Sequence, residues 1–269
     1  MGEEVTGYPC ASVFDGFAYN PDNPIKGVFL DWTYDNLGLI LYSTELWDLR
    51  VRAGNDRVPF LDPWKSRDVE QEGLNMLAWN DRELAGEGFV DWFNFDHPQL
   101  GKVQLGGWKM KEVLQNAPPS FLKAEAHKNC VFTLKHAGAV PRIAIEKAVA
   151  EHLGDGVYRI EVVVKNKGYL PTNITEMAKQ NKTARPVTVE LALPQGAELI
   201  LGKVKEEAGH LEGRVIAPGL NFYPGNLSTA KEKRLEWVVK APNGGDLAVK
   251  AVSEKAGKAA TTLALRAEV

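Results

Sequence analysis

The sequence predicts a chain in two parts, an α/β part over residues 1–138 and an all-β sandwich over residues 139–269. Three observations carry this prediction. Apolar runs and segments of helical period alternate in the first part, which is typical of helices packed on a sheet. After residue 141 the chain becomes a series of short alternating segments separated by turn residues. Six of the seven tryptophans lie before residue 109, and only Trp237 lies in the second part.

The first part begins its predicted regular structure with a short helix over residues 32–37. Asp31 is placed to cap the N-terminus of this helix, and Gly38 follows its C-terminus. The apolar run of residues 39–42 does not alternate, which predicts a strand covered on both faces of a mixed or parallel sheet. Glu45 follows the end of that strand, where the active sites of open sheets collect.

Two longer helices and a turn complete this part. Residues 66–86 have apolar positions spaced for one buried face, with Ser66 as the expected N-cap. Residues 89–108 combine a dense aromatic patch, a sharp turn and a short strand that ends at two glycines. A second helix is expected over residues 121–137, after a proline and serine start, and Gly138 and Pro141 end it.

The second part reads as seven or eight short antiparallel strands. Asp155-Gly156 and Asn243-Gly244-Gly245 supply turn signals between them. The expected strands cover residues 142–150, 157–165, 187–193, 198–201, 213–216, 234–240, 246–253 and 259–266.

Composition excludes several classes of function. The net charge of −3 and the absence of a lysine and arginine cluster give no reason to expect nucleic acid as a partner. No apolar run is long enough to span a bilayer, and the start of the sequence shows no signal peptide. Cys10 and Cys130 allow either one disulfide or two free thiols, and each is expected to be a small buried residue.

The stretch from Asp31 to Asp48 resembles the C-terminal signature of zinc carboxypeptidases of the carboxypeptidase A type. The residues in register with that signature are Asp31, Trp32, Tyr34, Gly38, Tyr42, Thr44, Glu45, Leu46 and Asp48. Residues 95–101, with the Val-x-Leu-Gly-Gly-Trp segment after them, resemble a segment typical of bacterial members of the same family. The resemblance covers about residues 5–137 and implies a carboxypeptidase-like mixed sheet there.

The resemblance implies roles for three residues. Glu45 matches the general base that activates a zinc-bound water. Leu30 matches the base of the pocket for the substrate's C-terminal side chain, where an apolar residue suits aliphatic or aromatic substrates; the alternative is that it packs in a core. Tyr19 matches a tyrosine on a flexible loop that closes over bound substrate, and the alternative is that it anchors its loop.

The zinc ligands of the family, a His-x-x-Glu and a later His, have no match here. None of the histidines His97, His127, His136, His152 and His210 has Glu three residues later. His97 is expected in a turn, and His210 with Glu207 and Glu212 in a surface turn, rather than in metal sites. We therefore expect no cofactor in this chain alone and zinc only in the complete enzyme, with this chain inactive by itself.

The expected function is thus that of the C-terminal portion of a metallocarboxypeptidase acting on peptide C-termini. An immunoglobulin-like sandwich follows it, of the kind appended to secreted bacterial hydrolases, so the resemblance implies a secreted or periplasmic location. The alternative is a non-catalytic binding or scaffolding protein built on a vestigial peptidase half-domain. In either case, the exposed edges of a half-domain predict association with the missing N-terminal half or self-association.

Overall fold

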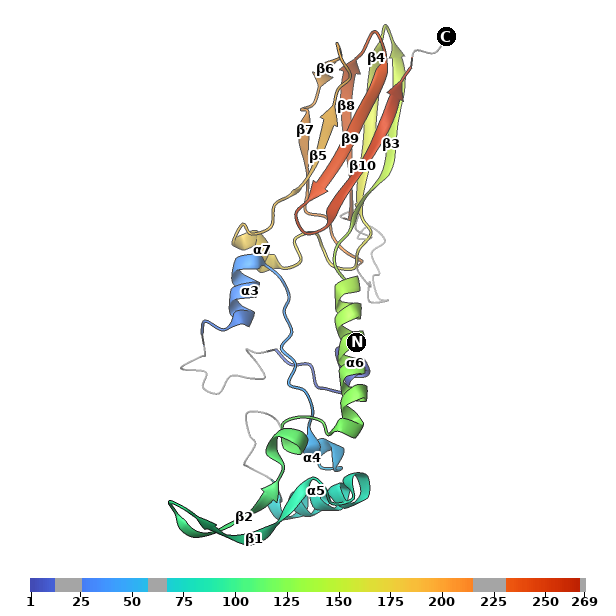
Figure 1. Ribbon diagram of the computed structural model, residues 1–269. Coiled ribbons are helices and arrows are strands. Elements are labelled where there is room, and N and C mark those ends of the chain that lie inside the picture. Colours follow the sequence, from blue (N-terminus) through green and yellow to red (C-terminus); the bar gives the residue numbers. More distant parts are fainter. Residues whose placement is uncertain (13–25, 58–66, 215–230, 267–269) are drawn as a thin grey trace, which may run out of the picture. The chain divides into compact units, whose positions relative to one another are not determined.

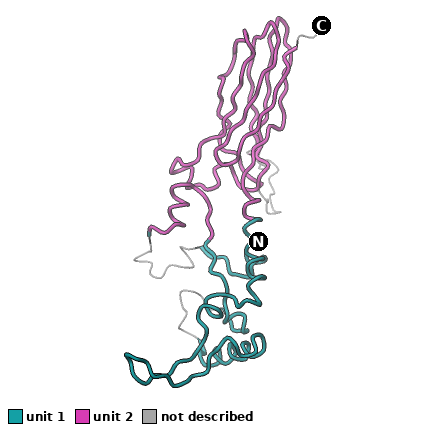
Figure 2. Tube along the Cα trace, viewed as in Figure 1, with its two compact units in different colours: residues 1–26, 43–135 teal, residues 27–42, 136–269 magenta. Residues whose placement is uncertain are grey.

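The computed structural model describes residues 1–12, 26–57, 67–214 and 231–266, and these form a β-rich mixed fold with three sheets and several helices (Figure 1). The chain divides into two compact units. Unit 1 comprises residues 1–26 and 43–135, and unit 2 comprises residues 27–42 and 136–269 (Figure 2). Tyr19, the candidate substrate-closing residue, lies outside the described residues.

Unit 1 is mostly helical. Its elements are α1 (Gly2–Thr6), α4 (Leu49–Arg52), α5 (Val69–Leu84), the π-helical turn η1 (Met110–Leu114) and most of α6 (Pro119–Gly138), together with the antiparallel hairpin of β1 (Phe89–His97) and β2 (Gly101–Trp108). Its small core is aromatic: the ring centroids of Trp47, Trp79 and Phe121 lie 5.4–6.0 Å apart. The predicted helices at 66–86 and 121–137 and the turn at His97 are confirmed.

Unit 2 contains two four-stranded antiparallel sheets. One has the order β3 (Ile143–Gly154), β4 (Val157–Asn166), β8 (Glu232–Lys240) and β6 (Glu198–Leu201). The other has the order β10 (Gly257–Leu265), β9 (Gly245–Ser253), β5 (Val187–Ala192) and β7 (Lys205–Gly209). Ile160, Val162 and Trp237 of the first sheet share one buried core with Val189 and Val249 of the second, so the two sheets form a sandwich.

Turn chemistry sets the register of the first hairpin in this sandwich. Asp155 and Gly156 join β3 to β4 with φ of 51° and 71°. Both values lie in the left-handed region, which favours Asp-Gly in a two-residue hairpin turn. The turn predicted from this dipeptide is therefore confirmed, and strands overlap seven of the eight segments expected in the second part. Gly213 and Arg214 lie in no strand, and residues 215–216 lie outside the described range.

Helices α3 (Phe29–Leu37) and α7 (Glu176–Gln180) complete unit 2 and lie beside each other (Figure 1). Helix α3 ends at Gly38 in the left-handed conformation, as expected, but its N-cap is Val28 and not Asp31. Asp31 lies in the first turn, where its negative charge suits the positive end of the helix dipole.

Several expectations about local structure are wrong. Residues 39–42 form no strand, because a strand requires a paired neighbour and no described strand pairs with them. Asp68 and not Ser66 caps α5: its carboxylate accepts from the Gln71 N–H at 2.9 Å. Both cysteines are free thiols, and both are exposed rather than buried.

Candidate functional site

Glu45 lies on a segment without regular secondary structure that leads from Ser43 to α4 in unit 1. Its side chain is exposed, and it makes no hydrogen bond or ion pair with other described residues. Two residues later, Trp47 is buried with φ of 73°, and its indole N–H donates to the Val113 carbonyl at 2.7 Å. Glu45 is thus an accessible carboxylate next to a firmly packed anchor.

A buried carboxylate supports that anchor. Glu125 of α6 is 3% exposed and accepts hydrogen bonds from Tyr8, Arg52 and Lys128. The Tyr8 hydroxyl in turn accepts from the backbone N–H of Trp47 at 3.0 Å. Burial would raise the pKa of Glu125, but the hydrogen bonds from Lys128, Tyr8 and Arg52 outweigh burial and hold the pKa below its usual range.

These polar partners were not predicted from the sequence. Tyr8 and Glu125 are 117 positions apart, and Arg52 and Glu125 are 73 positions apart. No local pattern marks such a pairing. Glu125 and Lys128 alone carry a signal, because residues three apart on a helix lie on one face.

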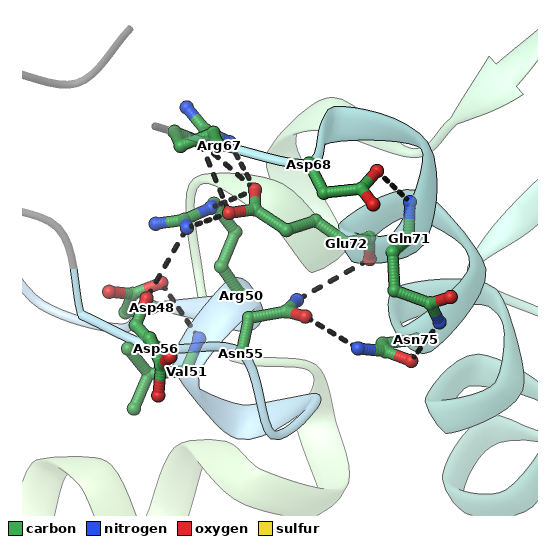
Figure 3. A network of polar contacts seen from close by, with 10 residues as sticks. All are labelled: Asp48, Arg50, Val51, Asn55, Asp56, Arg67, Asp68, Gln71, Glu72 and Asn75. Carbon is green, nitrogen blue, oxygen red and sulfur yellow. Dashed lines mark hydrogen bonds and ion pairs between the residues drawn. The ribbon is translucent and has the colours of Figure 1, made fainter. Parts of the chain in front are cut away.

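A second network in unit 1 joins α4 to α5 (Figure 3). Glu72 accepts from Arg50 at 2.7 Å and from the Arg67 Nε at 3.0 Å. The Asn55 side chain donates to the Glu72 carbonyl at 3.4 Å and accepts from Asn75 at 2.8 Å. Hydrogen bonds from Arg50 and then Arg67 lower the pKa of Glu72 from 4.5 to about 2. Both carboxylate oxygens of Glu72 accept from arginine side chains, so this network serves the fold of unit 1 and not a reaction.

The shifted pKa of Glu72 predicts a pH dependence of unit 1. A carboxylate whose pKa is lowered by folding stabilises the fold at pH values above its pKa in the unfolded chain. This contribution is lost as the pH falls from 4.5 towards 2. We expect Glu72→Gln to lower the melting temperature at pH 7 and to flatten the loss between pH 5 and pH 3, measured by near-UV circular dichroism. Glu70→Gln, an exposed carboxylate on the same helix, serves as the control. A variant profile as steep as that of the original chain would contradict the role of Glu72.

Leu30 lies half-buried in the first turn of α3 and belongs to unit 2, whereas Glu45 belongs to unit 1. Neither unit by itself brings the two residues together. Around Leu30, Phe29 and Trp32 stack at 5.8 Å and are both exposed. Leu30 therefore lies on a helix that presents apolar side chains to solvent.

The histidines follow the expectation only in part. His97 lies at the hairpin turn, where its Nδ1 accepts from the N–H groups of Gln99 and Leu100 at 3.1 Å. His210 does not lie in a surface turn: β7 ends just before it at Gly209, and Leu211 just after it is buried. Burial lowers the pKa of His210, and nearby Lys179 lowers it further. Across the described ranges, no three His, Cys, Asp or Glu side chains are placed to hold a metal ion.

The family comparison matches a part of the second unit. Residues 142–264, which span β3 to β10, match a family described as a domain of unknown function (DUF8731). No curated protein matches the chain. In the described residues, no helix has the length and apolar character needed to cross a membrane.

Three solved structures illustrate the likenesses found. The GAE domain of GGA2p from Saccharomyces cerevisiae is 14% identical, with 48% of this chain and 90% of that chain covered and a TM-score of 0.28. The CARDB domain of a Pyrococcus furiosus protein is 14% identical, with 48% and 95% covered and a TM-score of 0.26. An oxidised superoxide reductase is 17% identical, with 48% and 88% covered and a TM-score of 0.23. At these scores the likenesses identify no function.

Proposed function

We propose that the chain is the C-terminal part of a zinc metallocarboxypeptidase that removes apolar residues from the C-termini of peptides. The observation that carries this proposal is the register of nine residues from Asp31 to Asp48 with the family signature. The exposure of Glu45 supports it, because a general base must be reachable by water and substrate. An appended sandwich fits a secreted or periplasmic enzyme.

Glu45 has the role of general base in this proposal and accepts a proton from the attacking water. A positioned base contributes about 10²–10⁴ to the rate. Leu30 lines the pocket for the substrate's terminal side chain, and its apolar surface favours aliphatic or aromatic residues over Lys or Arg. Tyr19 closes over the bound substrate.

The described residues do not fit a zinc site, because a catalytic site needs three protein ligands and no such group is present among them. No histidine of the sequence has Glu three residues later, so the proposal assigns the family's His-x-x-Glu ligands to a polypeptide segment outside these 269 residues. That segment is encoded upstream of Met1 or lies on a partner chain.

Elemental analysis tests this assignment. We expect about one zinc per molecule in a chain extended through an upstream reading frame that encodes His-x-x-Glu and a further His, and none in the 269-residue chain. Replacing the upstream Glu ligand with Gln should remove the metal from the extended chain. Zinc bound stoichiometrically by the shorter chain would contradict the assignment.

One observation favours a second candidate, a non-catalytic binding or scaffolding protein. The β1–β2 hairpin exposes several large apolar side chains, including Trp92 at 63% and Leu100 at 73%. Exposed apolar patches mark surfaces that another polypeptide covers. In the peptidase proposal the missing half covers this hairpin, whereas in a scaffolding protein a separate partner or a second copy does.

Light scattering separates these two ways of covering the hairpin. The peptidase proposal predicts that the chain extended upstream is monomeric and that the 29.6 kDa chain self-associates. A monodisperse monomer of the shorter chain would contradict this expectation.

A further inference from the structure

The C-terminal end of α3 rests on a surface formed by the sandwich part of unit 2. We call this surface the α3 seat and define it by Thr175, Ala178, Asn181, Thr183 and Lys255. All five residues belong to the same unit as α3. They come from the loop and helix between β4 and β5 and from the turn between β9 and β10.

The seat satisfies carbonyl groups that a helix cannot satisfy by itself. The last four carbonyls of an α-helix lack intrahelical partners. In α3 the Gly38 and Leu39 N–H groups bond back to the carbonyls of Tyr34 and Thr33 at 3.0 and 3.3 Å. Carbonyls beyond these accept from the seat: Asn181 donates to Asp35 at 3.0 Å, Lys255 to Leu37, and Thr175 to Gly38 at 3.2 Å.

The Thr175 hydroxyl couples two helix ends. It donates to the Gly38 carbonyl and accepts from the Ala178 N–H at 3.1 Å, which caps the N-terminus of α7. Lys255 adds a cation at the negative end of the α3 dipole, a position that favours positive charge. The seat therefore matches the end of α3 in both hydrogen bonding and charge.

The fit is also steric. Gly38 has φ of 61°, which L side chains rarely adopt. A Cβ at this position would lie 2.2 Å from the Cβ of Ala178 and 3.0 Å from the Thr183 hydroxyl oxygen. Ala178 is fully buried. Only glycine therefore permits this approach of the backbone to the seat.

A helix as short as α3 needs such support. It has nine residues, and isolated helices below about 12–15 residues are marginal in water. Its exposed aromatic residues, Phe29 and Trp32, contribute no buried contact that would hold it. The hydrogen bonds at its C-terminal end therefore support the order of α3.

We infer that the sandwich part of unit 2 holds α3 in place through the α3 seat. The seat residues are then positioning residues for Leu30. The sandwich is then not a separable appendage, because it fixes the position of the helix that carries Leu30. The role of Leu30 in this inference rests on the proposed function, whereas the fixing of α3 by the α3 seat does not.

Hydrogen exchange on the 269-residue chain tests whether the α3 seat holds α3 in place, and it does not require catalysis. We expect Asn181→Ala combined with Lys255→Met to raise the exchange rates of amides in residues 29–39 at least tenfold, while amides of β4 and β8 keep their protection. Lys250→Met, an exposed lysine on β9, is the matched control and should change nothing. Unchanged exchange in the double variant would overturn the inference.

A second pair of variants tests the steric fit. Gly38→Ala should melt α3 by the same measure, and adding Ala178→Gly should restore part of the protection, because it removes the nearest colliding atom. The added substitution relieves the collision but not the strain of the positive φ. If Gly38→Ala alone leaves the exchange of α3 unchanged, the close approach is not required and the inference fails.

Selectivity in the extended enzyme then tests the link to Leu30. Lys255→Met should shift the ratio of kcat/KM for peptides ending in Leu against those ending in Ala by about threefold to tenfold, mainly through KM, because it displaces the pocket and not the base. Faster hydrogen exchange in α3 with an unaltered kcat/KM ratio would overturn the positioning of Leu30. It would leave intact the inference that the α3 seat holds α3. An extended chain without any peptidase activity would instead overturn the proposed function.

Discussion

Replacing Glu45 with Gln in the chain extended upstream is expected to lower kcat for the release of C-terminal residues by about 10²–10⁴. Glutamine keeps the size of the side chain and its exposure, but its amide cannot accept a proton from water. The zinc content and KM should stay near their original values, because the proposal gives Glu45 no part in metal or ground-state binding. Initial rates on acylated dipeptides ending in Leu or Phe measure the effect.

Two further variants sharpen this result. Glu70→Gln removes an exposed carboxylate from α5 in the same unit and should leave kcat unchanged. Glu45→Asp keeps the negative charge but shortens the side chain by one methylene. Its kcat should lie between that of the original enzyme and that of Glu45→Gln. An unaltered kcat in Glu45→Gln would refute the assignment of the base.

The largest expected loss of stability follows from Trp237→Ala in β8. Trp237 is fully buried at the centre of the sandwich core, and its indole N–H donates to the Lys203 carbonyl at 2.8 Å. Removing a buried aromatic ring costs about 3–5 kcal/mol, and the lost hydrogen bond adds about 1 kcal/mol. A domain has only about 5–15 kcal/mol of stability, so the sandwich should become marginal.

Urea unfolding followed by far-UV circular dichroism measures this free energy of unfolding. Trp92→Ala is the matched control, because Trp92 is largely exposed on β1 and its removal should cost less than about 0.5 kcal/mol. A cost below about 1 kcal/mol for Trp237→Ala would contradict the placement of Trp237 in the core.

The sandwich was largely predictable from the sequence, because its strands alternate apolar and polar residues and its turns carry Asp-Gly or Gly-Gly pairs. Strand β7 was missed, since its sequence Lys-Glu-Glu-Ala-Gly has no β-branched or aromatic residue. Pairing with β5 makes it a strand. Local propensity therefore predicted the strands of the sandwich core but not this edge strand.

The surroundings of the candidate site were much less predictable. The apolar run of residues 39–42 has the composition of a strand, but a strand forms only where a neighbour supplies hydrogen bonds. The assignment of residues 27–42 to unit 2 depends on contacts such as that of Thr175 with Gly38, which are 137 positions apart. No periodicity in a single sequence encodes such a contact.

Glu45 differs in its surroundings from two other glutamates of unit 1. Sequence register assigns it a role, and the structure places its carboxylate in solvent beside the buried Trp47. The half-buried Glu72 and the buried Glu125 both have arginine, lysine or tyrosine partners. Among these three glutamates, only Glu45 is free to meet a substrate.

The release of C-terminal amino acids by the chain extended upstream, with and without a zinc chelator, tests the peptidase proposal most directly. The proposal predicts release from peptides ending in Leu or Phe, little from those ending in Lys or Arg, and loss of release with the chelator. It also predicts no release by the 269-residue chain alone. Chelator-sensitive release by the 269-residue chain, or none by a zinc-loaded extended chain, would contradict it.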